Sequence, residues 1–400
     1  MITKCFTGDM AQAAEILRAG GLVAVPTETV YGLAGNGLDA AAVEKIYEVK
    51  GRPAVKPLSL MVHDSGAIGD YCEDVPAGAY KLAEKFWPGP LTIVLKARDI
   101  VPEIVRAGGE TLGLRCPDHK MTLDLLRAAK IPFAAPSANP SGEESPKNAE
   151  KVREYFDGRI DGIVDGGQCG IGLESTIIDM SQTPYKILRH GALPQEDIQS
   201  TLIENMQIIG ITGGTGCGKT TALNCLAHRG ALIIDCDALY HEMLKTDGEM
   251  LAEIDKYFPG AITDGVLDTK ALGVVVFNDR QALDDLNLIT HKHIDRRVDE
   301  LLAQHAMAGG ALAAIDAIAL IESGVSRKCD VVIGVIADYD MRVERIMKRD
   351  GISREYALAR VNSQQCDEFY RENCGYILEN SHGESEFKDK CEKLFSEVVK

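Results

Sequence analysis

The sequence has no Cys-x-x-Cys pair, only one tryptophan and no long uncharged apolar run. Its eleven cysteines are scattered and odd in number, which argues against a zinc site or a disulfide framework and favours free thiols in a reducing compartment. The apolar stretch Ala311–Ile321 is interrupted by Asp316 and is too short to span a bilayer. The start, Met1 to Lys4, lacks the shape of a signal peptide. We therefore expect a cytoplasmic protein without a membrane segment.

Positive charge is also scarce, since the formal net charge of the 400 residues is −17. The part before Met206 has 21 basic and 28 acidic residues, and the part from Met206 onward has 22 and 32. Neither half is therefore a basic module for DNA or an anionic membrane, and any anion site must gather its cations locally. The length exceeds the usual size of one hydrophobic core, so we expect two domains.

The second half opens with a phosphate-binding motif. Gly213–Thr220 matches G-x-x-x-x-G-K-[ST] at every fixed position, between an expected strand, Ile208–Ile211, and an expected helix, Ala222–His228. Glycines let backbone amides surround an anion, and the helix adds a partial positive charge at its N-terminus. Lys219 suits the β- and γ-phosphates of a nucleotide, and the Thr220 hydroxyl suits Mg²⁺. A chance glycine turn is the alternative, but it does not explain the flanking strand and helix.

Charged residues follow the motif at two places. A second strand ends at Asp235 and Asp237, and carboxylates at the C-terminal end of a parallel strand face the ligand crevice. One could act as a general base and the other could order the Mg²⁺ shell, or Asp237 could cap the next helix. A later helix places Arg345 and Arg349 on one face, as a solvated basic face or as a lid over phosphates. Strand regions are expected at Leu22–Val25, Thr92–Lys96, Gly162–Asp165, Ala231–Ile234, Ala311–Ile321 and Asp330–Ile336.

The first half mixes strands and helices, which predicts an α/β sheet domain. Its clearest cluster of cations follows the expected helix Ala40–Val49, where Lys50, Arg52 and Lys56 lie within seven residues. These cations either form a solvated helix end or bind a polyphosphate. The Gly and Pro residues between them fix the backbone, which favours the polyphosphate site.

Five motifs in the first half together resemble the YrdC-like threonylcarbamoyl-AMP synthase family, over about residues 8–193. They are Pro26–Leu33, Lys50-x-Arg52, Ser137-x-Asn139, Ser175-Thr176 and Ile187–Gly191. The resemblance implies a twisted mixed α/β sheet and an enzyme that uses L-threonine, bicarbonate and ATP and releases pyrophosphate. Its product would serve tRNA modification, so tRNA or tRNA-modification proteins are possible partners. A non-catalytic RNA-binding or carbamoyl-transfer module of the same fold is the alternative.

The same resemblance assigns roles by position. It assigns threonine binding to Thr29, Arg115, Ala135 and Ser175. It assigns ATP binding to Lys50, Arg52, Lys56, Thr111, Ser137, Asn139, Ser145 and Arg189, with Lys50 and Arg52 also catalytic. Such a site must neutralise a triphosphate and orient a carbamate for attack, so positioning and electrostatics would supply most of the catalysis.

The second half resembles dephospho-CoA kinase over about Gln207–Asn380, through Thr212–Thr221, Ile234–Asp237, Leu286–His291 and Arg345–Arg354. The resemblance implies a P-loop kinase with a parallel sheet and a helical lid, which moves the γ-phosphoryl group of ATP to the 3′-hydroxyl of dephospho-CoA. The family often has Pro-Leu-Leu where this chain has Asp316–Leu320, and Pro where Lys292 stands. Both departures bear on the acceptor. Another small-metabolite or nucleotide kinase is the alternative, and a GTPase is disfavoured because no Asn-Lys-x-Asp follows.

By position, the resemblance makes Asp237 the base, with Lys219 and Arg345 also catalytic. ATP would be bound by Gly214, Thr215, Gly216, Cys217, Gly218, Lys219, Thr220, Thr221 and Arg349. Thr220 and Asp235 would hold Mg²⁺, in part through water. We thus expect a bifunctional fusion of residues 1–193 and 206–400, joined by a linker at 194–205, with no channelling between the two sites.

Overall fold

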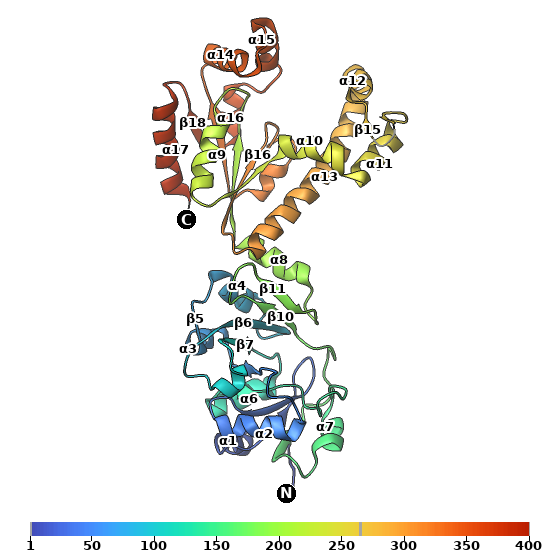
Figure 1. The fold of residues 1–400 in the computed structure, drawn as a ribbon, viewed down its shortest axis with the longest axis vertical. Helices are drawn as coiled ribbons and strands as arrows, with labels where there is room; N and C mark the ends of the chain where they lie inside the picture. Colours follow the sequence, from blue (N-terminus) through green and yellow to red (C-terminus); the bar gives the residue numbers. More distant parts are fainter. Residues whose placement is uncertain (1, 264–265, 400) are drawn as a thin grey trace. The chain divides into compact units, whose positions relative to one another are not determined.

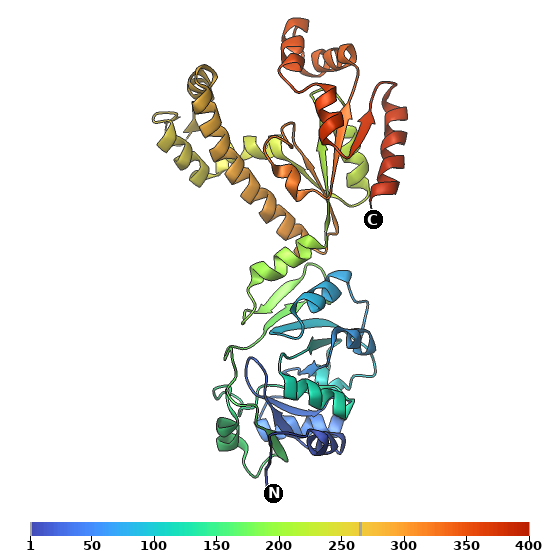
Figure 2. The same cartoon turned by 180° about the vertical axis from the view of Figure 1, so that it is seen from behind.

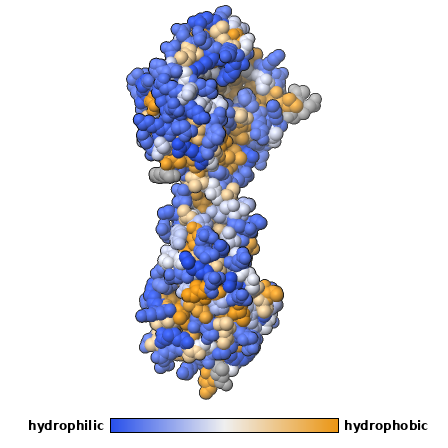
Figure 3. Space-filling model, turned by 60° about the vertical axis from the view of Figure 1, so that its left-hand side comes forward, coloured by the Kyte–Doolittle hydropathy of each residue, from blue (hydrophilic) through white to orange (hydrophobic). Residues whose placement is uncertain are grey.

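The computed structural model describes residues 2–263 and 266–399. The chain divides into two compact units, drawn as ribbons in Figures 1 and 2. The first unit runs up to Asn205 and includes Met307–Gly309, and the second comprises Met206–Ala306 and the residues from Gly310 onward. Hydrophilic residues predominate on the face seen in Figure 3, and hydrophobic ones gather in patches. Of the helices in the described ranges, none combines the length and the apolar character that a membrane crossing requires.

A mixed sheet forms the first unit. Its strands are β1 (Lys4–Phe6), β2 (Val23–Val25), β3 (Gly32–Asn36), β4 (Ser59–Met61), β5 (Cys72–Glu73), β6 (Leu91–Ala97), β7 (Thr111–Arg115), β8 (Phe133–Ala134), β9 (Gly162–Val164), β10 (Thr176–Asp179) and β11 (Lys186–Arg189). They follow the order β1-β9-β2-β3-β8-β4-β7-β6-β10-β11, and β5 pairs with β6. Strand β6 pairs parallel with β10 and antiparallel with β7, so the expected mixed sheet is confirmed.

The helices of the first unit are α1 (Ala11–Arg18), α2 (Ala40–Lys50), α3 (Ile68–Tyr71), α4 (Ala77–Phe86), α5 (Glu103–Arg106), α6 (Lys120–Ala129), α7 (Ala149–Phe156) and α8 (Gln195–Glu204), with a short 3₁₀ turn η1 (Ser65–Ala67). Helix α2 begins at Asp39, whose side chain accepts from the Ala41 amide, and ends at Gly51 with φ of 59°. Lys50 is therefore the last residue of the helix, and Arg52 follows directly after the Gly51 turn. Helix α8 lies in the segment expected as a linker and packs against α4.

The second unit is built on a parallel sheet. Its strands are β12 (Gln207–Thr212), β13 (Leu232–Asp235), β16 (Leu312–Asp316), β17 (Val331–Ile336) and β18 (Tyr376–Glu379), and a small hairpin joins β14 (Ile262–Thr263) to β15 (Val266–Leu267). The order is β13-β16-β12-β17-β18 with every pair parallel, as expected. The strand region expected at Ala311–Ile321 is too long. The strand ends at Asp316, where the chain leaves the sheet and turns beside a polar cavity.

Nine helices surround or extend this sheet within the described residues of the unit: α9 (Lys219–His228), α10 (Cys236–Thr246), α11 (Gly248–Tyr257), α12 (Thr269–Asn278), α13 (Arg280–Met307), α14 (Tyr339–Asp350), α15 (Arg354–Asn362), α16 (Asp367–Asn373) and α17 (Glu384–Val398), with a 3₁₀ turn η2 (Val325–Lys328). Helices α9 and α17 lie side by side and share a core with the strands (Figure 1). Helices α14 and α15 pack on each other through Val343, Ile346, Ala357 and Val361. We call this helix pair the lid.

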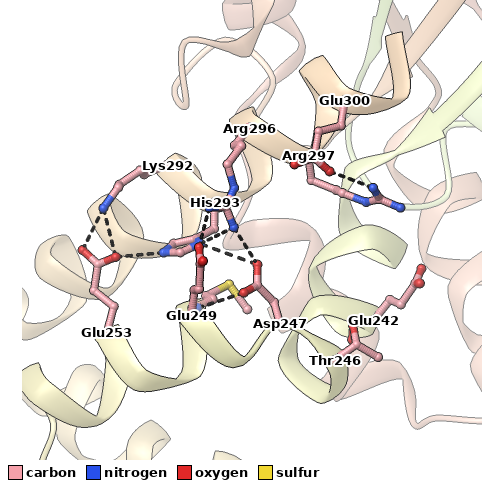
Figure 4. A network of polar contacts seen from close by, with 11 residues as sticks. Glu242, Thr246, Asp247, Glu249, Glu253, Lys292, His293, Arg296, Arg297 and Glu300 are labelled. Carbon is pink, nitrogen blue, oxygen red and sulfur yellow. Dashed lines mark hydrogen bonds and ion pairs between the residues drawn. The ribbon is translucent and has the colours of Figure 1, made fainter. Parts of the chain in front are cut away.

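Helix α11 is fastened to the long helix α13 by polar contacts (Figure 4). The buried ring of His293 lies with Nε2 2.8 Å from a Glu253 carboxylate oxygen. Arg296 donates to Glu249 at 2.6 Å, and Lys292 pairs with Glu253 at 3.0 Å. These contacts fasten α13, one of the helices that line the apolar cavity described below.

Candidate functional site

A cavity of about 430 Å³ lies in the first unit. Seven of the residues expected to bind ligands line it: Arg52, Thr111, Arg115, Ala135, Ser137, Ser175 and Arg189. They come from distant parts of the chain, which the sheet brings near one another: β6 lies between β7 and β10, and β11 pairs with β10. Five others stand behind the wall or outside it: Thr29, Lys50, Lys56, Asn139 and Ser145.

Arg115 in the wall of this cavity forms a buried ion pair. Arg115 Nη2 lies 2.8 Å from a Glu28 carboxylate oxygen and donates to Thr29 Oγ1 at 2.7 Å. The second Glu28 oxygen accepts from the amide of Asp118. The Arg115 Nε is buried and has no hydrogen-bond partner, so this guanidinium can still bind an anionic group. Glu28 has no role in the sequence-based assignment, and its motif position gave no sign that it pairs with Arg115.

A second polar cluster in the cavity wall comprises Arg189, Ser175 and Glu174. Arg189 donates to the Ser175 carbonyl through Nε at 3.0 Å and to the Ser175 hydroxyl at 3.1 Å, and it pairs with the Glu174 carboxylate. The Glu174 carboxylate also accepts from Ser145 Oγ at 3.1 Å. Glu174 is the one acidic residue among those that line the cavity. Ser145 therefore reaches the site through Glu174, a residue that sequence reasoning passed over.

Lys50 supports the cavity wall from behind. Its side chain is buried, and Nζ donates to the carbonyl oxygens of Ser137 and, at 2.5 Å, of Asn139. Burial first and the neighbouring Arg52 charge second lower the pKa of Lys50 to about 7, whereas the two carbonyl contacts favour the ammonium form. The structure thus makes Lys50 the residue that shapes the Ser137–Asn139 loop. Lys56 is exposed and lies outside the cavity.

A polar cavity of about 520 Å³ lies over the phosphate loop of the second unit. Of the expected residues, the cavity brings together Gly214, Thr215, Gly216, Gly218, Lys219, Thr220, Asp235, Asp237, Arg345 and Arg349. Cys217 is buried and Thr221 follows in α9, and neither lines the cavity. Lys219 Nζ donates to the Gly213 carbonyl at 3.1 Å and lies 3.8 Å from Asp316 Oδ1. The loop and the N-terminus of α9 therefore face the same cavity, where their amides can bind an anion.

Three carboxylates face this loop. Asp235 caps α10, because its side chain accepts from the Ala238 amide at 2.9 Å, and Asp237 lies in the first turn of the helix. The alternative that Asp237 is the helix cap is therefore wrong. Burial raises the pKa of Asp237, and burial raises the pKa of Asp316 to about 6. Asp316 Oδ1 is buried without a hydrogen-bond partner, which suits a cation ligand more than a structural role.

The lid supplies three arginines to the cavity wall. Arg345 Nη1 donates to the Gly216 carbonyl at 3.2 Å and Nη2 to Asn380 Oδ1 at 3.1 Å. Arg349 and Arg360 both bind the Asp350 carboxylate, at 2.7 and 2.6 Å. Arg354 is the last position of the motif used for the resemblance, but it pairs with Asp340 and does not line the cavity. The third lid arginine in the cavity wall is thus Arg360, which sequence reasoning missed.

A second cavity of the unit, of about 360 Å³, is lined mostly by apolar residues of α10, α12 and α13. It shares Asp237 with the phosphate cavity and includes His291 and Asn287. Lys292 points instead to Glu253, and Asp316 lines only the phosphate cavity. Lys292 therefore does not face the apolar cavity, whereas Ala317 and Ala319 of the departing segment Asp316–Leu320 do line it.

The geometry defines two classes of protein in one chain. The second unit has the parallel sheet, phosphate loop, carboxylate and arginine lid of a P-loop kinase. The first unit is a mixed-sheet domain with a cationic cavity. Family models match both parts: residues 15–191 match the model for Sua5, YciO and YrdC proteins, described as telomere recombination, and residues 207–386 match the dephospho-CoA kinase model.

Individual relatives agree with this division. The chain is 46% identical over 192 residues to the threonylcarbamoyl-AMP synthase of Pyrococcus abyssi, covering 48% of this chain and 56% of the relative. It is 34% identical over 192 residues to the dephospho-CoA kinase of Thermobifida fusca, covering 48% of this chain and 95% of the relative. The crystal structure of P. abyssi Sua5 complexed with L-threonine has 26% identity and a TM-score of 0.49, covering 84% of this chain and all of that one.

The chain belongs to the dephospho-CoA kinase family through its second unit, and it carries a Sua5/YciO/YrdC domain in its first. It spans about half the length of the threonylcarbamoyl-AMP synthases that it matches.

Proposed function

We propose that the chain is a bifunctional enzyme with one ATP site in each half, in domains of residues 1–193 and 206–400. The first would make L-threonylcarbamoyladenylate from L-threonine, bicarbonate and ATP and release pyrophosphate. The second would transfer the γ-phosphoryl group of ATP to the 3′-hydroxyl of dephospho-CoA. We place the protein in the cytoplasm, because all eleven cysteines are free thiols. Involvement of tRNA would be indirect, through the adenylate product.

In the first unit, the buried Arg115 with its unpartnered Nε would take the threonine carboxylate, beside Thr29 and Ser175. Arg52 and Arg189 would take the ATP phosphates, with Lys50 holding the Ser137–Asn139 loop against them. The threonine amine would first add to bicarbonate and form a carbamate with loss of water. A carbamate oxygen would then attack the α-phosphorus of ATP, whose bond to the β-phosphate oxygen breaks as pyrophosphate leaves. The relative whose structure is titled as a complex with L-threonine supports this substrate.

In the second unit, the observation that carries the proposal is Asp237, which lines both the phosphate cavity and the apolar cavity. A hydroxyl presented from the apolar side would lose its proton to Asp237 while its oxygen attacks the γ-phosphorus, and ADP leaves. Lys219, Arg345 and Arg349 would balance the developing charge. Mg²⁺ would neutralise the β- and γ-phosphates, and the oxygen donors that fit it are Thr220, Asp235 and Asp316.

An ATP-turnover screen of the whole chain tests both halves. Threonine with bicarbonate should cause release of pyrophosphate, and dephospho-CoA alone should cause formation of ADP and CoA. Tight tRNA binding without pyrophosphate release would instead identify the first unit as a non-catalytic RNA-binding module. ADP formation with another hydroxyl compound, but not with dephospho-CoA, would refute the acceptor and keep the kinase.

Asp316 predicts the acid limb of the kinase activity. Its pKa lies near 6, raised by burial, so it is ionised at pH 7.5 and gains a proton as the pH falls through 6. The neutral acid can neither pair with Lys219 nor bind a cation. We therefore expect kcat/KM for ATP to fall about tenfold per pH unit below about 6. The check is a pH profile of dephospho-CoA phosphorylation from pH 5 to 9; a rate that stays flat to pH 5 would contradict the prediction.

A further inference from the structure

Two residues bind the phosphate loop from outside the phosphate cavity: Arg342 of the lid, and Gln364, which follows the lid. Gln364 follows the C-terminus of α15, and its Oε1 accepts from the Thr215 amide at 2.8 Å and from Arg342 Nη2 at 3.0 Å. Its Nε2 donates to Thr215 Oγ1 at 2.7 Å. Arg342, in α14, donates through Nε to the Thr215 carbonyl at 3.2 Å. Gln364 thus binds the amide and the hydroxyl of Thr215, and Arg342 of the lid binds its carbonyl.

The bond from Arg342 to the Thr215 carbonyl is buried, and the three bonds of Gln364 are partly buried. Arg342 is 4% exposed and Thr215 is 8% exposed. A buried guanidinium without partners carries a large desolvation cost, so Arg342 depends on Gln364 and on the Thr215 carbonyl for its place. Neither Arg342 nor Gln364 is among the residues that line the phosphate cavity, so both act on the loop from outside the ligand space.

Two glycines of the loop lie close to the same two residues. A Cβ on Gly214 would lie 2.0 Å from Arg342 Nη2 and 2.9 Å from Gln364 Oε1. A Cβ on Gly216 would lie 2.9 Å from the Arg342 carbonyl oxygen. The Arg342 backbone therefore leaves no room for a side chain at Gly216, and a side chain at Gly214 would displace the ends of Arg342 and Gln364. The lid and the loop are packed as one body.

We propose that Gln364 is a positioning residue that fixes the phosphate loop to the lid, so that the two present a preassembled ATP site. The inference rests on the proposed kinase function of the second unit. Without Gln364, the Thr215 amide and Arg342 lose a shared acceptor and the loop can relax toward other arrangements. ATP would then have to reorder the loop on binding, which weakens its affinity, whereas the acceptor cavity is untouched.

The test compares three variants of the full chain: Gln364→Ala, Gln364→Glu and Gln365→Ala. Dephospho-CoA-dependent ADP formation reports the second unit alone, because the ATP site of the first unit does not use this acceptor. We expect Gln364→Ala to raise KM for ATP about tenfold or more, with KM for dephospho-CoA unchanged. Gln364→Glu should restore most of the affinity, since a carboxylate accepts from the Thr215 amide, the Thr215 hydroxyl and Arg342. The exposed neighbour Gln365 is the matched control, and its variant should behave as wild type.

Thermal unfolding separates positioning from general damage. If Gln364→Ala leaves KM for ATP unchanged, or lowers stability and raises both KM values equally while Gln364→Glu fails to rescue, the inference is overturned. If the wild-type chain does not phosphorylate dephospho-CoA, the proposed acceptor is refuted, but the inference about Gln364 is not. The inference is then tested by measuring ATP binding. The binding that is lost in Lys219→Ala belongs to the second unit, and Gln364→Ala should weaken that same binding.

Discussion

Replacing Lys219 by alanine is expected to lower phosphoryl transfer to dephospho-CoA by about a thousandfold, or about 4 kcal/mol of barrier. Lys219 is the cation that the loop itself supplies to the cavity, and its Nζ is fixed between the Gly213 carbonyl and Asp316. Its removal takes a charge from the β- and γ-phosphates and leaves Asp316 unpaired beside them. The measurement is kcat/KM for ATP with dephospho-CoA as the acceptor.

Two controls make this result specific. Lys245→Ala removes an exposed lysine at the end of α10, outside both cavities of the unit, and should leave the rate unchanged. Threonine-dependent pyrophosphate release should also persist in Lys219→Ala, because the other ATP site has its own cations. Loss of both activities, or an unchanged kinase rate, would refute the assignment of Lys219.

Arg52→Ala is expected to lower threonine-dependent pyrophosphate release about a hundredfold or more. Arg52 lines the cavity of the first unit, and its guanidinium is held there by the carbonyl oxygens of Lys56 and Pro57 at 3.3 and 2.9 Å. Because its partners are neutral carbonyls, its charge is free to meet a phosphate. Release of pyrophosphate in the presence of threonine, bicarbonate and ATP is the readout.

Arg98 offers the matched control for Arg52. It is an exposed arginine that also donates to a backbone carbonyl, that of Cys72 at 2.9 Å, but it does not line the cavity. Arg98→Ala should therefore keep full activity. If Arg52→Ala releases pyrophosphate as fast as Arg98→Ala does, the cations after α2 serve the fold and not the substrate.

What the sequence could predict was local. The loop at Gly213–Thr220 lies between a strand and a helix as its motif requires, because short-range glycine and capping preferences decide that geometry. Arg345 and Arg349 reach the same cavity because helical spacing puts residues four apart on one face. The mixed sheet followed from the resemblance, since neither composition nor periodicity specifies the order of eleven short strands.

The residues that were missed depend on long-range packing. Gln364 lies 149 positions from Thr215, and nothing in its neighbourhood distinguishes it from Gln365. Asp316 read as a break in an apolar run, yet it lies beside Lys219 because β16 pairs with β12. Glu28 and Glu174 gain their meaning only from Arg115 and Arg189, which the fold brings to them. Pairings of this kind are set by strand order and loop path, which a single sequence does not show.

Asp237 lines both the phosphate cavity and the apolar cavity of the second unit. Its position would therefore set how far an acceptor must extend from the apolar cavity to be phosphorylated. On the proposed function, an acceptor bound in the apolar cavity would be phosphorylated only if its hydroxyl reached Asp237. Acceptors with a shorter group in the apolar cavity would still bind there, but their hydroxyl oxygen would not line up with the γ-phosphorus. Such acceptors should therefore lose kcat more than affinity. The kinase would then select acceptors by their length as well as by their chemical groups.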